Sequence, residues 1–186
     1  MIYALIYIID VMLGLYATAV LLRFLLQWTR ASFYNPLAQA IVRLTNPLLL
    51  PLRRLIPGWR GLDLAALLLT FLIQLLNVAI VCWLLDFPLA AGPLLWWTLL
   101  RIIYLLIMLF TFTILIEAVL SWLSQARAGP GANLLWSINA PILRPLRRHI
   151  PPVAGLDFSP LIALVALQAI NIALGQSGLL PDWLRL

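Results

Sequence analysis

Charged residues are scarce in this chain, and lysine is absent. Only 10% of the 186 residues are charged and 65% are hydrophobic, whereas an ordinary soluble domain has about 25% charged residues. Apart from one histidine, every basic residue is an arginine, whose guanidinium stays ionised and binds phosphate or carboxylate groups with paired hydrogen bonds. The composition therefore predicts a membrane protein, and its net charge of +6 suits lipid headgroups better than nucleic acid.

Cysteine and histidine occur once each, as Cys82 and His149. A lone cysteine gives no disulfide framework and no cluster of thiol ligands for a metal. The sequence also has no glycine-rich phosphate loop and no pattern that pairs a nucleophile with a base. We therefore expect no enzymatic activity, no metal site and no cofactor, and we expect Cys82 to fill space in an apolar core.

Four apolar stretches are long enough to cross a bilayer, which requires about 20 mainly apolar residues. They are residues 2–27, 64–85, 95–122 and 158–175. The first stretch has neither a basic leading region nor a small-residue cleavage site, so we interpret it as a retained span and not as a signal peptide. The predicted fold class is an all-α membrane protein with four transmembrane helices.

Arginines gather in the two long segments between these spans. Segment 28–63 has five and segment 123–157 has four, whereas the turn at 86–93 has none and the C-terminal tail has one. These ten residues are Arg30, Arg43, Arg53, Arg54, Arg60, Arg127, Arg144, Arg147, Arg148 and Arg185. Because basic residues near span ends are retained in the cytoplasm, we expect an inner-membrane, multi-pass protein with both long segments cytoplasmic and both termini periplasmic.

The chain matches itself at an offset of 94 residues. The stretch PLLLPLRRLIP at 47–57 matches PILRPLRRHIP at 141–151, and both copies continue into Gly-Leu-Asp. Each copy is a span, an elbow and a second span, and an even number of crossings gives both copies one orientation, as in a parallel repeat. The predicted units are 1–92, with its elbow at 28–63, and 93–186, with its elbow at 123–157 and a tail after the last span.

Both elbows contain prolines that bracket an arginine pair. Residues 35–46 begin with Asn-Pro and carry apolar residues at helical spacing, which predicts a short amphipathic helix in the interface, and 131–140 predict a second one. Beyond these helices, proline removes backbone donors and favours extended predecessors, so we expect a non-helical bend at headgroup depth. The bracketing residues are Pro47, Pro51, Pro57, Pro141, Pro145 and Pro151.

The arginine pairs of the elbows allow two interpretations. They act only as stop-transfer and orientation signals, or they form a binding site for anionic lipid or a partner. Near an anionic surface, each arginine contributes about 1 kcal/mol of electrostatic attraction. These residues are Arg53, Arg54, Arg147 and Arg148. Asp63 and Asp157 precede the next spans, where an aspartate caps a helix. An added ion pair with the nearby arginines is the alternative.

Four ionisable side chains lie within the spans: Asp10, Arg23, Arg101 and Glu117. Each costs about 2.5–3.5 kcal/mol at the bilayer centre, so partners are expected. In the 94-residue match Arg23 aligns with Glu117, and Arg101 lies within one helical turn of the level of Asp10. We predict two ion pairs between the first and third spans, Arg23 with Glu117 and Asp10 with Arg101. The alternative is that both arginines extend to the interfaces.

Two pairs of amides occupy matching positions in the second and fourth spans. They are Gln74 with Asn77, and Gln168 with Asn171. The spacing of three places each pair on one helix face. Such amides either form hydrogen bonds between helices or line a polar path, and the sequence leaves both interpretations open.

The doubled Pro-x-x-x-Pro-Leu-Arg-Arg-x-Ile-Pro motif, the following Gly-Leu-Asp, and Trp28 and Trp122 ahead of the elbows resemble the YggT family of small integral membrane proteins, in its two-copy proteobacterial form. The resemblance implies a role in osmotic or salt-stress tolerance and ion homeostasis, in envelope organisation, or in membrane-complex assembly, without an agreed biochemical activity. The copies differ at Asn46, matched by Ala140, and at Leu55, matched by His149, so the two elbows need not act alike.

These features favour a non-enzymatic scaffold or assembly protein of the inner membrane. Its arginine elbows are expected to bind anionic lipid headgroups or the acidic surface of a partner, either another membrane protein or a second copy of this chain. The alternative is a small ion-conducting or transport component that uses the amide face and the buried charges. With four spans, such a component is expected to work as an oligomer.

Overall fold

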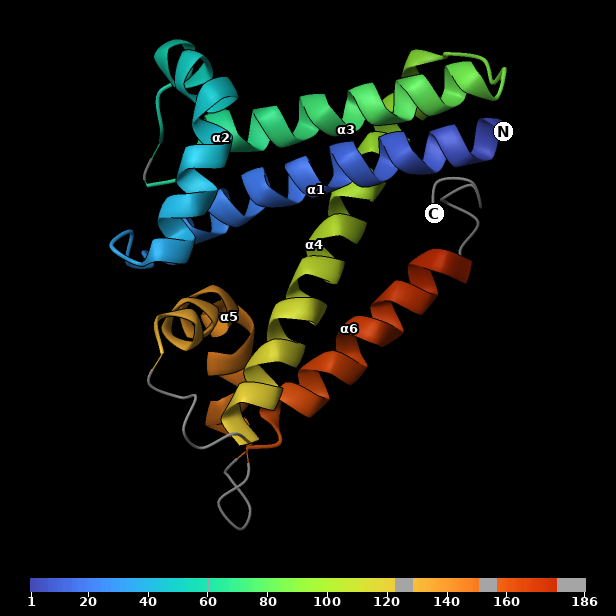
Figure 1. Ribbon diagram of the computed structural model, residues 1–186. Coiled ribbons are helices and arrows are strands. Elements are labelled where there is room, and N and C mark those ends of the chain that lie inside the picture. Colours follow the sequence, from blue (N-terminus) through green and yellow to red (C-terminus); the bar gives the residue numbers. More distant parts are fainter. Residues whose placement is uncertain (60, 123–128, 151–156, 177–186) are drawn as a thin grey trace.

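The computed structural model describes residues 1–59, 61–122, 129–150 and 157–176. Across these ranges the chain forms helices joined by turns, with one isolated bridge between Trp59 and Leu62. The helices are α1 (Ile2–Trp28), α2 (Pro36–Leu55), α3 (Leu64–Leu84), α4 (Ala91–Trp122), α5 (Pro130–His149) and α6 (Ser159–Gln176) (Figure 1). The predicted all-α class is confirmed.

Helices α1, α3, α4 and α6 are long and apolar enough to cross a membrane, as the four apolar stretches predicted. Their ends follow the prediction except at α4, which begins at Ala91, four residues before the expected start. Pro93 lies in the first turn of α4, where proline is tolerated because the backbone donors of that turn have no partner within the helix. The helix therefore extends back through Gly92 and Pro93.

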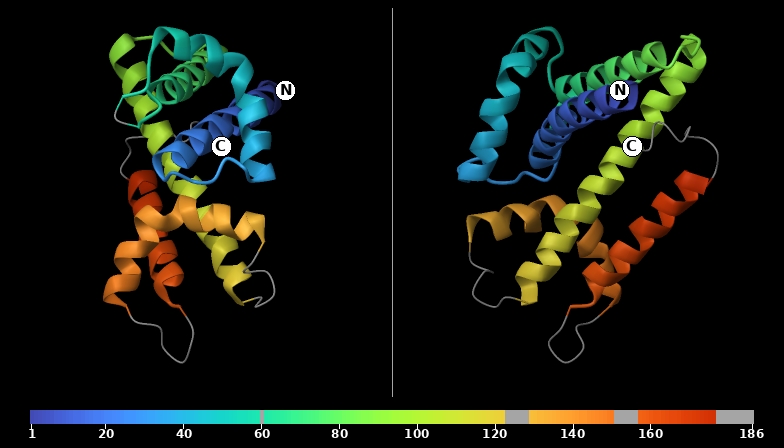
Figure 2. Two further views of the ribbon diagram at one scale, coloured as in Figure 1. Left: turned by 90° about the vertical axis from the view of Figure 1, so that its left-hand side faces the viewer. Right: turned by 45° about the vertical axis from the view of Figure 1, so that its right-hand side comes forward.

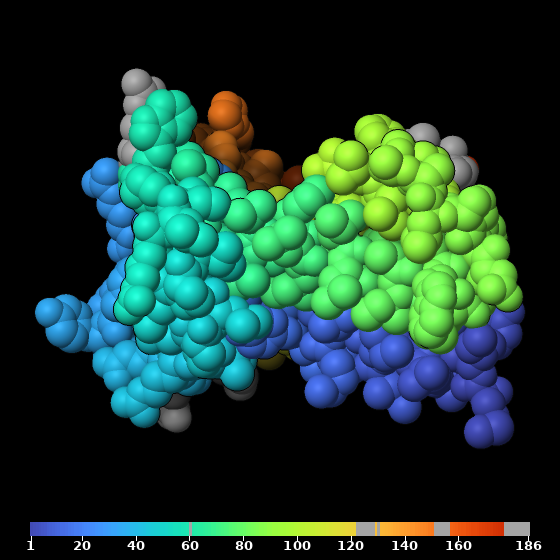
Figure 3. Space-filling view, turned by 90° about the horizontal axis from the view of Figure 1, so that it is seen from above, coloured from blue at the N-terminus to red at the C-terminus, as the bar shows by residue number. Residues whose placement is uncertain are grey.

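The spanning helices form two hairpins that meet along α4. Helices α1 and α3 lie side by side, α4 packs against α3, and α6 runs along α4 (Figure 1). The elbow helices α2 and α5 lie at the same end of the molecule, and the N-terminus and the C-terminal end of α6 lie at the other (Figure 2). Figure 3 shows α2 standing across the end of the α1 and α3 pair.

Close packing of α1 on α3 follows from small residues in their contact. Ala17 of α1 and Ala65 and Ala66 of α3 are fully buried in one cluster, and small side chains let membrane helices approach closely. Toward the other end of α3, Cys82 is buried in a separate apolar cluster with Val78. Cys82 therefore fills core space, as expected.

The two hairpins are joined by a cluster at the elbow end. Leu25 and Leu26 of α1 are buried with Phe110 and Ile114 of α4 and with Ile138 of α5. This cluster connects the first hairpin to the elbow helix of the second. The polar groups described below are therefore held by helices that pack on one another, and not by free loops.

The expected non-helical bend at the proline brackets is wrong. Pro47 and Pro51 lie inside α2, and Pro141 and Pro145 lie inside α5. All four prolines are exposed, and the spacing of four puts both prolines of each helix on one face. The carbonyl groups that lose their helical donors are therefore on the surface, where water or headgroups can donate to them. Each elbow helix bends without ending (Figure 2).

The break comes at the last proline of the first bracket. Helix α2 ends at Leu55, and Ile56 is extended, with φ of −123° and ψ of 97°, as expected for the residue before Pro57. Ile150 after α5 has nearly the same angles, −120° and 97°. The residues predicted at Arg60, Arg127, Pro151 and Arg185 lie outside the described residues, and so does the side chain of Trp122.

The start of α2 agrees with the Asn-Pro signal. Asn35 is the N-cap, and its side-chain oxygen accepts a hydrogen bond from the backbone N–H of Leu37 at 2.9 Å. Pro36 follows in the first turn, where its missing N–H and fixed φ are favourable. Helix α5 likewise begins with a proline, Pro130. Both elbow helices are therefore longer than predicted, since they include the proline brackets.

Candidate functional site

Buried and half-buried polar side chains gather in three clusters, two at the elbows and one near the opposite end. The first elbow cluster is Arg23, Gln27, Thr45, Asn46, Arg53 and Asp63. The second elbow cluster is Thr113, Glu117, Asn139, Arg147 and Asp157. The outer cluster is Asp10, Asn77 and Arg101.

In the first elbow cluster, Asp63 joins the end of α2 to the start of α3. Its carboxylate caps α3 by accepting a hydrogen bond from the N–H of Ala66 at 3.2 Å, and it forms an ion pair with Arg53. Arg53 also donates to the side-chain oxygen of Gln27 on α1 at 3.1 Å. Asp63 therefore has both the capping role and the alternative ion pair. Arg53, which is on α2, connects that helix to α1 and to the start of α3.

Arg23 is buried without a carboxylate in contact. Its side chain is on α1 and the residue is 4% exposed. One guanidinium nitrogen donates to the carbonyl oxygen of Val42 at 3.1 Å, to Thr45 Oγ1 at 2.8 Å and to Asn46 Oδ1 at 2.6 Å. All three acceptors are neutral groups of α2. The predicted ion pair between Arg23 and Glu117 is therefore wrong, because Arg23 faces its own elbow helix and not α4.

In the second elbow cluster, Arg147 is held between two carboxylates. Its Nη2 donates to Glu117 Oε1 at 2.8 Å and its Nε donates to Asp157 Oδ2 at 2.7 Å. The guanidinium carbon also lies 4.8 Å from the ring centre of Trp136, within range of a cation–π contact. One arginine thus connects α4, α5 and the start of α6.

The side-chain amide of Asn139 and the hydroxyl of Thr113 complete the second elbow cluster. Asn139 on α5 donates to Glu117 Oε2 at 2.7 Å, and its own oxygen accepts from the hydroxyl of Thr113 at 2.7 Å. Both oxygens of the buried Glu117 carboxylate therefore have donors. The sequence did not lead us to predict Gln27, Thr45, Asn46, Thr113 and Asn139 as cluster members, or Trp136 as a contact of Arg147. A signal was available, because Thr45 and Asn139 match at the 94-residue offset.

The charged groups of the second elbow cluster stabilise one another's ionised forms. Burial alone lowers the pKa of the Arg147 guanidinium, but its hydrogen bonds to Glu117 and Asp157 outweigh burial and raise it above its ordinary value. Burial alone raises the pKa of the Asp157 carboxyl, but hydrogen bonds from Arg147 and from Ser159 hold it below its ordinary value. Both groups are therefore charged at neutral pH.

The two elbows share one ion pair and differ in net charge. Arg53 with Asp63, and Arg147 with Asp157, occupy matching positions and are paired in both hairpins. At the position of Arg23, however, the second hairpin has Glu117. Two arginines and one carboxylate give the first elbow cluster +1, whereas one arginine and two carboxylates give the second −1. The charges are thus opposite on similar frameworks.

The outer cluster contains the second predicted ion pair. Asp10 on α1 pairs with Arg101 on α4, and it also accepts from the side-chain N–H of Asn77 on α3 at 3.0 Å. The pair between Asp10 and Arg101 is present as predicted. Its reason is the contact of α1 and α3 with α4, which brings all three helices to one buried polar group.

The two amide pairs have different surroundings. Gln74 and Asn77 are buried in the helix contacts of α3, where Asn77 contributes to the outer cluster. Gln168 is exposed on α6 and Asn171 is half-buried. The matched amides therefore do not form one shared polar face in the described part of the chain, which leaves the conduction alternative without its expected path.

Each arginine pair splits into one inward and one outward side chain. Arg53 and Arg147 form the ion pairs already described, whereas Arg54 and Arg148 are exposed at the ends of α2 and α5. Arg43, Arg144 and His149 are exposed as well. Within the described ranges no group of three or more His, Cys, Asp or Glu side chains is placed to hold a metal ion.

Comparison with known proteins gives a family but no described activity. The sequence model of the CCB3/YggT family matches residues 2–84 and 96–178. An uncharacterized protein of Pseudomonas aeruginosa is 44% identical over 171 residues, covering 91% of this chain and 87% of the relative. The uncharacterized protein YggT of Escherichia coli strain K12 is 34% identical over 171 residues, covering 91% and 88%.

A protein of Vibrio alginolyticus, also uncharacterized, is 34% identical over 197 residues and covers 97% of both chains. No solved structure matches this chain. Both family matches together include every residue of the three polar clusters. The chain belongs to the CCB3/YggT family.

Proposed function

We propose that this protein is a non-enzymatic scaffold or assembly protein of the inner membrane. Its elbow helices bind anionic headgroups on the cytoplasmic side, its termini face the periplasm, and α6 binds a membrane-protein partner or a second copy of the chain. The observation that carries this proposal is the placement of α2 and α5 at one end of the molecule (Figure 2). Each of these helices has an exposed arginine beside an ion-paired one.

The surface of α2 supports an interfacial position. Leu44, Leu48 and Leu50 are each at least half exposed, and Arg54 is exposed at the end of the same helix. An exposed leucine surface next to a basic group is suited to the boundary between acyl chains and headgroups. There each arginine contributes about 1 kcal/mol of attraction to an anionic surface. The ion pairs with Asp63 and Asp157 hold the neighbouring arginines, so Arg54 and Arg148 are the free contacts.

The outer surface of α6 supports the partner site. Gln168 is exposed, between the exposed apolar side chains of Val165 and Ile172. An amide that faces hydrocarbon without a partner is unfavourable, and amides between membrane helices contribute about 0.6–2 kcal/mol each. A polar helix of another protein or of a second copy satisfies Gln168 and Asn171. By the family resemblance, osmotic or salt stress is the condition in which loss of this scaffold is expected to matter.

Two double variants test the proposal, and each is the control of the other. Arg54→Gln with Arg148→Gln is expected to lower retention of phosphatidylglycerol in native mass spectrometry by about fivefold per arginine, while crosslinked neighbours in native membranes stay the same. Gln168→Leu with Asn171→Leu is expected to remove those neighbours and leave lipid retention unchanged.

A charge-preserving variant refines the lipid measurement. Arg54→Lys with Arg148→Lys keeps both positive charges and is expected to retain phosphatidylglycerol, because attraction to an anionic surface depends on charge. Unchanged lipid retention in the glutamine variant, together with unchanged neighbours in the α6 variant, contradicts the scaffold proposal. Ion flux through liposomes that contain the purified protein supports the conducting alternative instead.

A further inference from the structure

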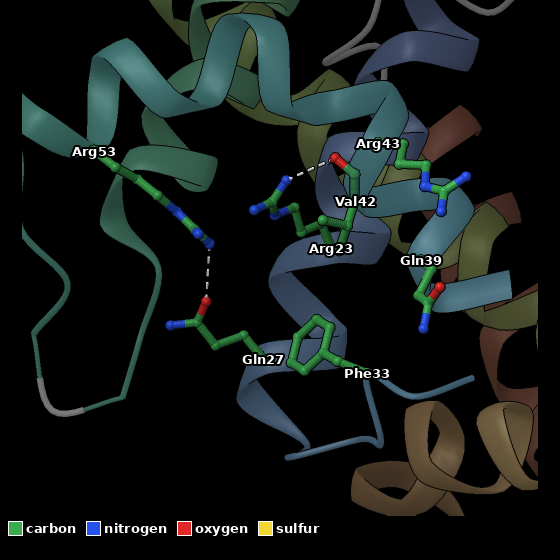
Figure 4. Close-up of a pocket in the computed structure, with 7 residues that line it drawn as sticks. All are labelled: Arg23, Gln27, Phe33, Gln39, Val42, Arg43 and Arg53. Atoms are coloured by element: carbon green, nitrogen blue, oxygen red, sulfur yellow. Dashed lines mark hydrogen bonds between the residues drawn. The ribbon is translucent and has the colours of Figure 1, made fainter. Parts of the chain in front are cut away.

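We propose that the first elbow holds a binding site for a phosphate-type oxyanion, in a cavity between α1 and α2. The cavity has a volume of about 420 Å³, and three of the residues that line it are arginines: Arg23, Arg43 and Arg53. Figure 4 shows Arg23 and Gln27 on α1, with Arg53 reaching toward them from the end of α2. Arg43 projects from the first half of α2, with its guanidinium directed away from Arg23 in this view. This inference does not depend on the scaffold role, since it uses neither α6 nor Arg54 or Arg148.

The charge of Arg23 has no carboxylate to balance it. Arg23 is 4% exposed, its contacts are the neutral oxygens of α2, and its Nε has no hydrogen-bond partner among the described residues. The charged groups that act on it electrostatically are Arg53 and Asp63, and Asp63 is already paired with Arg53. A buried cation is unfavourable unless an anion or several hydrogen bonds compensate it. The three hydrogen bonds satisfy one nitrogen of the guanidinium, but its Nε has no partner among the described residues and no carboxylate contacts Arg23, so an anion in the cavity would add both a hydrogen bond and a balancing charge.

The second hairpin shows how the same framework satisfies that need. There the position of Arg23 is occupied by Glu117, and both carboxylate oxygens of Glu117 accept hydrogen bonds, from Arg147 and from Asn139. The position of Arg43 is occupied by Ser137. The second elbow therefore contains its own anion and lacks two of the three arginines. By comparison, the first elbow has Asp63 as its one carboxylate, already paired with Arg53, and it has two additional cations.

The lining of the cavity indicates the class of anion. Guanidinium groups bind phosphate oxygens with paired, charge-assisted hydrogen bonds, and the side-chain amides of Gln27 and Gln39 can donate as well. Arg53 is neutralised by Asp63, so Arg23 and Arg43 leave two positive charges for a phosphate monoester or diester. The volume lies within the range of about 300–1,000 Å³ that is usual for small-ligand sites.

The place of the cavity leaves two sources for the phosphate group. Arg23 is five residues before the end of α1 at Trp28, which is about 7.5 Å along a helix, and Phe33, Gln39 and Arg43 on the cavity rim are exposed. The site is therefore near the end of a spanning helix and open to the outside of the protein. A headgroup phosphate of an anionic lipid and free inorganic phosphate both satisfy this geometry.

Arg43→Gln is the main test variant, because Arg43 is exposed and no hydrogen bond joins it to another described residue, so the fold does not depend on it. Arg144→Gln is its control, since Arg144 is an exposed arginine on α5 away from the cavity. Arg23→Glu is the second variant. It introduces at position 23 the glutamate that the second hairpin has at the matching position, Glu117. It supplies an internal carboxylate to Arg53, so it is expected to fold and to abolish anion binding.

The purified full chain is measured in two arms. In the lipid arm, native mass spectrometry compares retention of phosphatidylglycerol with retention of phosphatidylcholine. In the free-phosphate arm, the thermal unfolding temperature in phosphatidylcholine nanodiscs is followed against inorganic phosphate, with chloride at equal ionic strength as the reference. Arg43→Gln is expected to weaken binding about fivefold in the arm that holds the true source, beyond any loss in Arg144→Gln, which removes an exposed elbow charge but none from the cavity.

The outcomes separate the sources and decide the proposal. Loss confined to the lipid arm assigns the site to a lipid headgroup, and loss confined to the phosphate arm assigns it to a soluble phosphate. If helical content by circular dichroism is intact and neither arm distinguishes Arg43→Gln or Arg23→Glu from Arg144→Gln, the proposal is wrong. Loss of lipid retention in Arg54→Gln with Arg148→Gln alone supports the scaffold and not this cavity.

Discussion

Single residues decide how the charge of each elbow is balanced. Arg53 and Arg147 each have an aspartate partner, at matching positions of the two hairpins. Arg147 also has Glu117 as a second carboxylate, whereas Arg53 has the neutral Gln27. A carboxylate that loses its charge in such a pair leaves an uncompensated arginine, which is unfavourable in proportion to burial. The ionised form of Asp157 is therefore expected to stabilise the second elbow.

Stability is expected to depend on Asp157 at acid pH. The pKa of the Asp157 carboxyl is lowered from 3.8 in the folded chain, so the folded state favours the ionised form. Its contribution is present above pH 3.8 and is lost as the pH falls through the lowered value. The unfolding temperature in detergent, measured against pH, is expected to fall in that window, and Asp157→Asn is expected to flatten the fall.

The matched control for this measurement is Asp86→Asn. Asp86 is exposed in the turn before α4, so removing its charge is expected to leave both the unfolding temperature at neutral pH and its acid dependence close to those of the unchanged chain. An acid profile of Asp157→Asn that superimposes on that of the unchanged chain contradicts the role assigned to the pair with Arg147.

At the scale of elements, the elbow helices show how proline works within a helix. Each pair of prolines is exposed and lies on one helix face, so the lost hydrogen bonds open toward solvent or headgroups. The opposite face stays buried, with Ala38, Thr45 and Leu49 of α2 packed inside the molecule. The helix can therefore bend around the end of its hairpin and still present one continuous buried face.

Substituting alanine for the internal prolines is expected to keep α2 helical. Proline is about 3 kcal/mol less favourable than alanine in a helix interior, so Pro47→Ala with Pro51→Ala is expected to leave helical content by circular dichroism unchanged and to straighten the helix. Pro57→Ala is the contrasting variant. It removes the constraint that keeps Ile56 extended, so it is expected to let α2 continue. A rise in helical content in the double variant alone contradicts this assignment.

At the scale of the whole molecule, both elbows lie at one end and the outer cluster joins the hairpins near the other. Asp10, Asn77 and Arg101 connect α1, α3 and α4, and Leu25, Ile114 and Ile138 belong to the cluster that connects α1, α4 and α5. Polar contacts within membrane protein interiors are favoured over exposure to hydrocarbon. The two hairpins are therefore held together at both ends by different kinds of contact.

This arrangement predicts that both elbows are accessible from one side of the membrane. Arg54→Cys and Arg148→Cys, each in a Cys82→Ala background, are expected to react with a membrane-impermeant thiol reagent from the cytoplasmic side, because nine arginines in the two elbows favour retention there. Tyr3→Cys is the control and is expected to react from the periplasmic side. Labelling of positions 54 and 148 from opposite sides contradicts the arrangement.

Much of the fold follows from local properties of the sequence. A spanning helix satisfies its own backbone hydrogen bonds, so a sufficiently long apolar stretch is enough to predict it, and α1, α3, α4 and α6 agree with that prediction. The cap at Asn35 and the stop before Pro57 are local as well. The proline brackets misled the prediction because their cost depends on whether the freed carbonyl groups face solvent, which no local pattern states.

The sequence by itself determined the four long apolar helices, the 94-residue match and the segments in which the arginines gather, since each depends on composition or spacing along one chain. Only the tertiary structure decided that Arg23 bonds to α2 and Glu117 to Arg147, and that Gln168 faces outward while Gln74 is buried. Residues at equal depth in two helices meet only if those helix faces turn toward each other. That rotation is set by the packing of whole helices.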